Sequence, residues 1–439
     1  MKVVRVPKYY NFDDFFYMML PMGDFWKNDM GFDTMLYRGE PSAKYKLLPS
    51  ALRGGKLSIK FGSREPLNQP EQVKREYYAL WDFYKLANEN GLKVKASEEM
   101  QNSYLTTMSP LGSKDESFKW LSPEYEELAA LAQHYGVKTR LIDWSSDLYT
   151  SLYFASVGAL RSWKKSFDSD WKDDSYDTKD SIVVYILNGG IVHEMIRKIP
   201  LKLIVPPYSD NPNLRAQKGV LSYWQVDLPA RNNEGYDFSK HPIDNRPLTQ
   251  QIEEHDLGYE SDHIRIMYRV EIDINECGYI YSVMNKLGYN AAKLFPSYDG
   301  VKQKLEEDEI YFEFRNWINN QRSDDYNLCV DMYNKALICS ENQEGVLLDK
   351  LVDKFDLPQM VFEIKKNAAK VLEELSEEDK KLLALDIYNI PNGIIIITPL
   401  DREDSYCVHM RKWTIVFDMT SEKLTVYGIN TRGDKTHET

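Results

Sequence analysis

The stretch from Glu124 to Ala155 constrains the fold most, because a short polar segment there separates two strongly apolar patterns. In the first pattern, apolar residues over 128–135 recur at helical spacing. Gly136 follows directly and can end a helix in the left-handed conformation. The run 145–147 consists of residue types that favour the N-cap position. The sequence therefore predicts one helix that ends at Tyr135 and a second helix from about residue 148 to about residue 163.

The segment between these two helices predicts a turn that both helices hold in place. It is too short and too mixed in character for a helix of its own. The polar and aromatic residues in and next to this segment are Gln133, His134, Thr139, Arg140, Asp143 and Trp144. Loops on a rigid support often carry binding or catalytic residues. We therefore expect a functional site in this part of the chain.

Composition limits the classes of function. A chain of 439 residues exceeds the size at which one hydrophobic core usually keeps growing, which favours two domains. The net charge of -13 opposes general binding to nucleic acids or to anionic membranes, because such binding relies on Lys and Arg at phosphates. A local basic groove is still compatible with this overall charge.

Cysteine spacing and the first residues indicate the compartment. The four cysteines show no CxxC spacing, so the sequence predicts neither a disulfide framework nor a metal site. Asp13 and Asp14 interrupt the apolar stretch that a signal peptide would need. No run of about 18 apolar residues is present to span a membrane. The expected location is the cytoplasm.

Periodicity outlines the remaining elements. It predicts helices over residues 12–19 and 71–88, and strands over 34–40, 181–188, 202–205 and 263–273. It also predicts a short helix capped by Ser50, a loop over 213–219 that leads into a strand, a polar insertion over 229–261 and a helix that begins near 299. Beyond residue 322 it predicts helices over 325–340 and 345–388, broken at Pro358 and near Ser376. A small sheet from 394–397, 408–419 and 423–427 would follow, with a hairpin turn at 420–422.

The predicted fold is α+β. A mixed sheet with helices would form a first domain over residues 1–320, and a smaller α+β domain would follow over 321–439. Six motifs of the first domain occur in a fixed order: LYRGE at 36–40, LPSALR at 48–53, LAQHYGVKTRLIDWS at 131–145, LYFA at 152–155, NLRAQKG at 213–219 and LFPSYDG at 294–300. In this order they resemble the bacterial FRG domain, named for its Phe/Tyr-Arg-Gly motif, over residues 34–305.

The resemblance suggests a nucleotide ligand. An Arg-Gly pair at the end of an early strand is similar to the opening motif of ADP-ribosyltransferase-like folds. Arg38 would there hold the pyrophosphate or the adjoining ribose of NAD, since a guanidinium offers paired donors to phosphate oxygens. Such enzymes use a glutamate at the nicotinamide ribose, and the nearest candidate in this chain is Gln217, whose amide carries no negative charge.

The residues themselves allow the same chemistry. Breaking the glycosidic bond of nicotinamide requires a phosphate anchor, an aromatic face and a carboxylate near the developing positive charge. The predicted cofactor-binding residues are Arg38, Tyr37, Arg140, Trp144 and Arg215, and the predicted catalytic residues are Asp143, His134 and Gln217. The resemblance implies ADP-ribosyl transfer or NAD hydrolysis as the expected activity, by an effector in bacterial stress response or phage defence.

A structural interpretation of the same residues stays open. Arg140 and Asp143 could form a buried ion pair, Trp144 could be a core residue and His134 could interact with the helix dipole. Gln217 could satisfy backbone groups at a bend. Under this alternative the domain is a non-catalytic binding or sensing module, and residues 321–439 contact a protein partner.

Overall fold

The structure is a computed structural model of the chain. It describes residues 2–20, 25, 34–54, 57, 65–102, 118–168, 176–195, 197–228, 241–258, 264–318, 346–347, 361–376, 379–380, 383, 387, 398–399, 405–410, 413–419 and 423–431. The chain forms two compact units, one of Met1–Lys8 with Phe16–Ile310 and one of Tyr9–Phe15 with Tyr311–Thr439. Both contain helices and strands, which confirms the α+β class. The predicted domain boundary after residue 320 stays a prediction.

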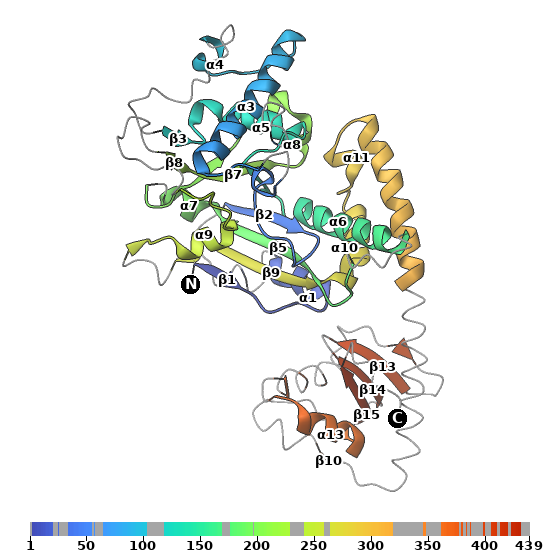
Figure 1. Cartoon of the computed structure of the whole chain (residues 1–439). Helices are drawn as coiled ribbons and strands as arrows, with labels where there is room; N and C mark the ends of the chain where they lie inside the picture. The colour runs from blue at the N-terminus through green and yellow to red at the C-terminus, as the bar shows by residue number, and fades with distance from the viewer. Residues whose placement is uncertain are drawn as a thin grey trace. The chain divides into compact units, whose positions relative to one another are not determined.

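A seven-stranded mixed sheet forms the centre of the first unit, in the order β1-β9-β5-β2-β4-β7-β6 (Figure 1). Its strands are β1 (Val3–Arg5), β2 (Met35–Glu40), β4 (Ile142–Ser145), β5 (Ser181–Asn188), β6 (Leu201–Ile204), β7 (Gly219–Trp224) and β9 (Met267–Asp273). Strand β1 runs parallel to β9, and the other neighbours are antiparallel. Every residue of β5 is buried, which is typical of a strand covered on both faces.

Helix α6 (Leu148–Asp168) lies against β2 and against α10 (Cys277–Lys286). A Cβ atom at Gly39 would lie only 2.0 Å from the backbone oxygen of Ser151 in α6. The glycine of the Arg-Gly motif is therefore required by the close approach of a helix to a strand. This packing leaves the neighbouring Arg38 on the opposite face of β2, since side chains alternate along a strand.

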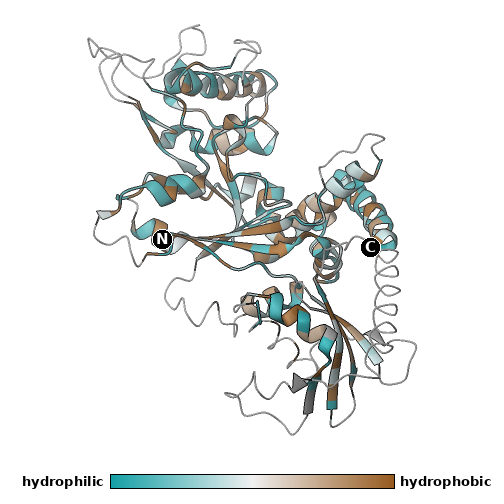
Figure 2. Ribbon diagram, turned by 60° about the horizontal axis from the view of Figure 1, so that its bottom comes forward, coloured by the Kyte–Doolittle hydropathy of each residue, from teal (hydrophilic) through white to brown (hydrophobic). Residues whose placement is uncertain are grey.

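The helices α3 (Gln69–Glu89) and α5 (Pro123–His134) share a second core with residues of β6 and β7. Other elements are α1 (Phe12–Met19), η1 (Ser50–Leu52), α4 (Glu98–Asn102), α7 (Gly189–Glu194), α8 (Pro212–Ala216), α9 (Leu248–Glu254), α11 (Ala291–Leu294) and a helix over 298–318. A small sheet joins β3 (Phe118–Trp120) to β8 (Val226–Leu228). In Figure 2 the strands of the central sheet are mostly brown, whereas teal predominates on the outer helices. Among the described residues, no helix combines the length and apolar character needed to cross a membrane.

The second unit contains a six-stranded sheet in the order β10-β11-β15-β14-β13-β12. Its strands are β10 (Val346–Leu347), β11 (Val361–Ile364), β12 (Thr398–Pro399), β13 (Ser405–Met410), β14 (Trp413–Met419) and β15 (Lys423–Thr431). Helix α13 (Lys366–Glu374) contributes Ala368 to a core with Trp413 and Phe417 of β14. The unit is thus stabilised by burial of one sheet face under a helix.

Several predicted elements are confirmed. Helix α1 has the predicted bounds, and α3 extends the predicted helix by a few residues. Helix α5 has Tyr135 as its C-cap, and Gly136 follows with a φ of 85°. Helix α6 begins at Leu148 as expected. Strands β2, β5, β6 and β9 lie where alternation predicted them.

Other predictions are wrong in part. The expected turn over 139–144 contains strand β4, which tertiary pairing with β7 holds despite its short length. The predicted loop over 213–219 contains α8, and the polar insertion contains α9, whose Leu248 and Ile252 are buried. Pro49, not Ser50, occupies the N-cap position of η1.

The later part of the chain also departs from expectation. The segment 345–388, predicted as helices broken at Pro358 and near Ser376, contains α13 but also the strands β10 and β11, because their apolar residues pair in the second sheet. The single run predicted over 408–419 contains two antiparallel strands, β13 and β14. The segments 325–340, 394–397 and 420–422 lie outside the described residues.

Candidate functional site

The centre of the sheet contains a point where two neighbouring strands separate. Strands β2 and β4 share a single registered pair, Tyr37 opposite Ser145, whereas β2 pairs with β5 over six residues. Beyond this pair, β2 and β4 form no further registered pairs. A side chain can enter such a gap and take the place of the missing hydrogen bonds.

Arg38 joins the two strands at this gap. Its Nε donates to Oε1 of Glu40 at 2.7 Å, and its Nη1 donates to the backbone oxygen of Asp143 at 2.9 Å. The same Nη1 lies 3.7 Å from Oδ2 of Asp143. Its Nη2 has no hydrogen-bond partner in the part of the chain that the structure describes. The guanidinium therefore has donor capacity left for a ligand.

Arg38 keeps its positive charge in this setting. Burial works against the charged form, but the carboxylates of Glu40 and Asp143 outweigh it, so the pKa of Arg38 is raised above its usual value. The Arg38 side chain is 17% exposed. A permanent cation with a small solvent-accessible surface is thus held at the gap between the strands.

Asp143 carries the negative charge of the site. Gln133 of α5 donates from Nε2 to Oδ1 of Asp143 at 2.6 Å, and Thr139 donates to the amide oxygen of Gln133. Oδ2 of Asp143 accepts no hydrogen bond from any described residue, and its side chain is 64% exposed. The carboxylate therefore faces solvent with one oxygen free to accept.

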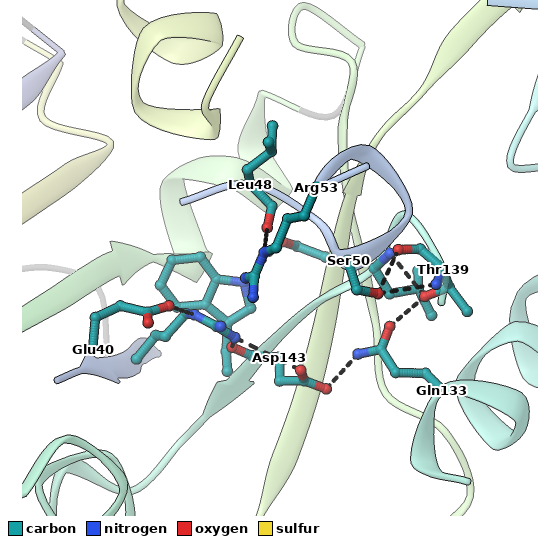
Figure 3. A network of polar contacts seen from close by, with 11 residues as sticks. Glu40, Leu48, Ser50, Arg53, Gln133, Thr139 and Asp143 are labelled. Atoms are coloured by element: carbon teal, nitrogen blue, oxygen red, sulfur yellow. Dashed lines mark hydrogen bonds and ion pairs between the residues drawn. The ribbon is translucent and has the colours of Figure 1, made fainter. Parts of the chain in front are cut away.

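The loop after β2 closes the network on its other side. Ser50 Oγ donates to the backbone oxygen of Thr139 at 3.1 Å and accepts from the Thr139 backbone nitrogen at 3.1 Å. In Figure 3 the contacts lead from Glu40 past Asp143 to Gln133, Thr139 and Ser50. The motifs LYRGE, LPSALR and LAQHYGVKTRLIDWS thus supply one continuous set of polar contacts.

His134 lies at the end of α5, beside this network. Its Nε2 is 3.2 Å from the side-chain nitrogen of Asn213 in α8, and Nδ1 has no hydrogen-bond partner among the described residues. Burial lowers the pKa of His134 below its ordinary value, while the charge of Asp143 works in the opposite direction. When the Asn213 amide donates to Nε2, the ring proton sits on Nδ1. The imidazole is therefore neutral near pH 7 and offers Nδ1 to a ligand.

Arg140 lies elsewhere than expected. Its Nε and Nη2 donate to the two oxygens of Glu76 at 2.7 and 2.9 Å, and both side chains are almost fully buried. Trp120 donates to the same carboxylate at 2.6 Å. The expected ion pair between Arg140 and Asp143 is therefore wrong, because the carboxylate of Glu76 in α3 is the partner. The geometry gives no support to a role of Arg140 in cofactor binding.

Two predicted ring contacts are also buried. Trp144 is 3% exposed, and its Nε1 donates to Ser222 at 2.8 Å. Tyr37 is 6% exposed. Burial, with a contribution from the nearby Asp147, raises the pKa of Tyr37 to about 12. Both rings are core residues, so neither presents a free face for stacking.

The two remaining candidates come from the NLRAQKG motif. Gln217 donates from Nε2 to the backbone oxygen of Leu294 at 3.1 Å, as the structural interpretation expects. Arg215 is exposed and has no side-chain partner among the described residues. Arg38, His134 and Asp143 therefore come together, whereas Arg140, Trp144, Tyr37 and Gln217 have structural contacts. The described part of the chain contains no group of three or more His, Cys, Asp or Glu side chains placed to hold a metal.

The sequence analysis did not assign Gln133 and Asn213 to the site. Gln133 belongs to the same motif as Asp143, one helical residue before His134, and this position was the available signal. Asn213 gave no such signal, because its contact with His134 depends on the unpredicted helix α8.

Comparison with known proteins gives one match. Residues 33–162 match the family model of the FRG domain. The matched part of the chain includes Arg38, Ser50, His134 and Asp143. The motifs at 213–219 and 294–300 lie beyond the matched residues. No curated protein and no solved structure matches the chain. The ordered motifs and this match together show that the chain is an FRG domain-containing protein.

Proposed function

We propose that the FRG domain binds NAD or a related nucleotide at the Arg38 site and acts on it as an ADP-ribosyltransferase-like or NAD glycohydrolase-like effector. The biological setting would be bacterial stress response or phage defence. Arg38 would hold a phosphate, and Asp143 would lie next to the ribose whose glycosidic bond breaks.

The observation that carries this proposal is that three neighbouring side chains each have an open polar atom. Nη2 of Arg38 can donate, Oδ2 of Asp143 can accept, and Nδ1 of His134 has no partner among the described residues. The Asp143 side chain is 64% exposed and the Arg38 side chain is 17% exposed, so a ligand from solvent can reach the open atoms of both. A phosphate next to a ribose hydroxyl matches this arrangement of donor and acceptor.

The charges fit bond cleavage at the ribose. Loss of nicotinamide leaves positive charge on the ribose, and the Asp143 carboxylate would stabilise it electrostatically. Gln133 fixes the orientation of that carboxylate through its 2.6 Å hydrogen bond. The neutral His134 would orient a ribose hydroxyl by donating a hydrogen bond from Nδ1.

A second candidate function is a non-catalytic sensing module. The contact of Gln217 with Leu294 favours it, because no glutamate from this motif reaches the site. The continuous contacts from Glu40 to Ser50 also suit a rigid binding surface. In this case the domain binds a nucleotide without consuming it.

The test combines binding and turnover. Isothermal titration of the full chain with NAD and with ADP-ribose would be repeated for Arg38→Gln and Asp143→Asn. We expect Arg38→Gln to weaken both ligands at least tenfold. We expect Asp143→Asn to abolish release of nicotinamide, measured by chromatography, with a smaller effect on ADP-ribose binding.

Arg246→Gln is the matched control, since Arg246 also pairs with two carboxylates, those of Asp244 and Glu254. It should bind both ligands as the wild type does. Binding of NAD without any nicotinamide release would select the sensing module. An absence of binding by the wild type would reject both candidates.

A further inference from the structure

A second polar cluster lies at the start of α6. The buried carboxylate of Asp147 accepts at Oδ2 from Lys218 Nζ at 2.9 Å and from the hydroxyl of Tyr289 at 2.8 Å. Asp147 is 8% exposed, whereas the Lys218 side chain is 58% exposed. The lysine is therefore anchored at a buried acid while most of its length faces solvent.

The backbone holds Lys218 in an unusual conformation. Its φ is 48°, which makes it the only described residue other than glycine with a positive φ. Such a conformation is unfavourable for a residue with a Cβ atom, as lysine has. The backbone oxygen of Lys218 accepts from Ser146 at 3.1 Å, so the residue is fixed to the end of β4. Strain of this kind is concentrated at functional sites.

A second lysine lies next to the same tyrosine. Nζ of Lys293 in α11 is 3.6 Å from the centre of the Tyr289 ring. Gln217 bonds to the neighbouring Leu294, which ties α8 to α11. Lys218 and Lys293 thus come from segments that are far apart in sequence, and both ammonium groups adjoin Tyr289.

We propose that Lys218 and Lys293 form an anion subsite that takes a phosphoryl group of the ligand bound at Arg38. The proposal rests on the proposed function and makes the ligand class more specific: a nucleotide with at least two phosphates, one at Arg38 and one at the lysine pair. Two ammonium groups supply point charges for one phosphate, while the guanidinium supplies paired donors for the other.

The local charge supports an anionic occupant. The chain as a whole is strongly acidic, with a net charge of -13, so a cationic cluster is not a general property of its surface. Asp147 offsets one of the two lysines and leaves one positive charge uncompensated. The exposed Arg215 lies three residues before Lys218 and has no partner among the described residues. A second positive charge is therefore available close by along the chain.

The chain also places the two subsites near one another. Asp143 and Asp147 flank the end of β4, and Ser145 between them donates to the backbone oxygen of Gln217 at 2.7 Å. The segment that carries Lys218 is thus hydrogen-bonded to the strand that carries Asp143. The proposed ligand would extend along the end of β4 from Asp143 toward Lys218.

The experiment measures binding of ADP-ribose, adenosine and inorganic pyrophosphate to the full chain. The variant Lys218→Met with Lys293→Met should weaken ADP-ribose at least tenfold, weaken pyrophosphate by a similar factor and leave adenosine unchanged. Lys286→Met with Lys302→Met is the control with the same change of charge, and both of its sites are exposed lysines. It should bind all three probes as the wild type does.

Lys293→Met alone keeps the test valid if loss of the Asp147 partner unfolds the double variant, and it should weaken ADP-ribose about threefold or more. If the lysine variants bind ADP-ribose as tightly as the wild type while Arg38→Gln binds it more weakly, the subsite is overturned and the proposed function stands. A third outcome is that the wild type binds pyrophosphate but not ADP-ribose, and that the lysine variants bind neither. The anion subsite then stands and the proposed function falls. If the wild type binds neither, both fall.

Discussion

Nη1 of Arg38 donates a hydrogen bond of 2.9 Å to the backbone oxygen of Asp143, and this bond joins two central strands that share only one registered pair. The side chain thereby replaces part of a strand ladder. It also carries the charge and the open donor on which the proposed nucleotide site depends. The structural role and the proposed binding role of Arg38 therefore fall on one side chain, and the experiments below separate them.

Gly39→Ala should destabilise the first unit strongly. The new Cβ would lie 2.0 Å from the Ser151 oxygen and 2.8 Å from the Cβ of Ala155, so α6 would have to move. We expect a loss of about 3 kcal/mol or more in the free energy of unfolding, above the usual range for overpacking. Urea denaturation followed by circular dichroism would measure it.

Gly91→Ala is the control for this substitution. Gly91 has a φ of 69° and nothing within 4 Å of an added Cβ. Only the backbone conformation opposes the change, so the expected cost is about 1 kcal/mol. Equal costs at the two glycines would contradict the role assigned to the contact between α6 and β2.

Arg140→Met should destabilise the fold without a direct effect on ligand affinity. The substitution leaves the Glu76 carboxylate buried without its cation, which costs about 3 to 5 kcal/mol in comparable pairs. The double variant Arg140→Met with Glu76→Met removes both charges and should regain part of that loss. Thermal and urea unfolding would measure both variants. A single variant as stable as the wild type would show that the pair is dispensable.

The sequence predicted where the candidate site lies in the chain better than it predicted which side chains contact one another there. Arg38 and Asp143 were identified because a glycine and a helix break mark the ends of their elements, and such local signals are visible in one sequence. The partner of Arg140 was not predictable, because Glu76 lies 64 residues away and its burial depends on how α3 packs against α5. Asp143 was assigned to a turn because four residues are too few to show strand alternation.

The second sheet also shows that local sequence patterns do not reveal long-range strand pairing. Residues 361–364 were assigned to a helix, although they form β11 beside β15. The helical pattern of this part of the chain belongs to α13, which begins directly after β11. The conformation of residues 361–364 is decided instead by parallel pairing with β15, about 60 residues later in the chain. Long-range pairing of this kind leaves no local periodicity to detect.

The pKa of His134 should lie below 6.5 and should fall further in Asp143→Asn. Burial lowers the pKa, whereas the negative charge of Asp143 raises it, so removing that charge leaves burial unopposed. Nuclear magnetic resonance titration of the imidazole ring would measure both values. A higher pKa in Asp143→Asn would contradict the proximity of the two side chains.

The same shift predicts a dependence of stability on pH. Between the folded-state pKa and about 6.5, the unfolded chain binds a proton that folded His134 does not. The contribution of His134 to stability is therefore present above about 6.5 and is lost as the pH falls. His134→Gln should reduce this part of the pH dependence, as measured by urea unfolding between about pH 5 and pH 8.

Arg38→Lys tests whether the guanidinium is needed for its shape as well as its charge. A lysine keeps the positive charge but has a single nitrogen, so it cannot contact Glu40, Asp143 and a phosphate in the geometry of Arg38. We expect ADP-ribose affinity to fall at least tenfold and the free energy of unfolding to fall by about 1.5 to 3 kcal/mol, the usual range for a hydrogen bond to a charged group. Arg246→Lys, at an exposed pair of carboxylates, should leave ADP-ribose affinity unchanged and stability within about 1 kcal/mol of the wild type. If the Arg38→Lys variant binds ADP-ribose as tightly as the wild type, Arg38 acts only as a link between β2 and β4, and the nucleotide site would then have to lie elsewhere.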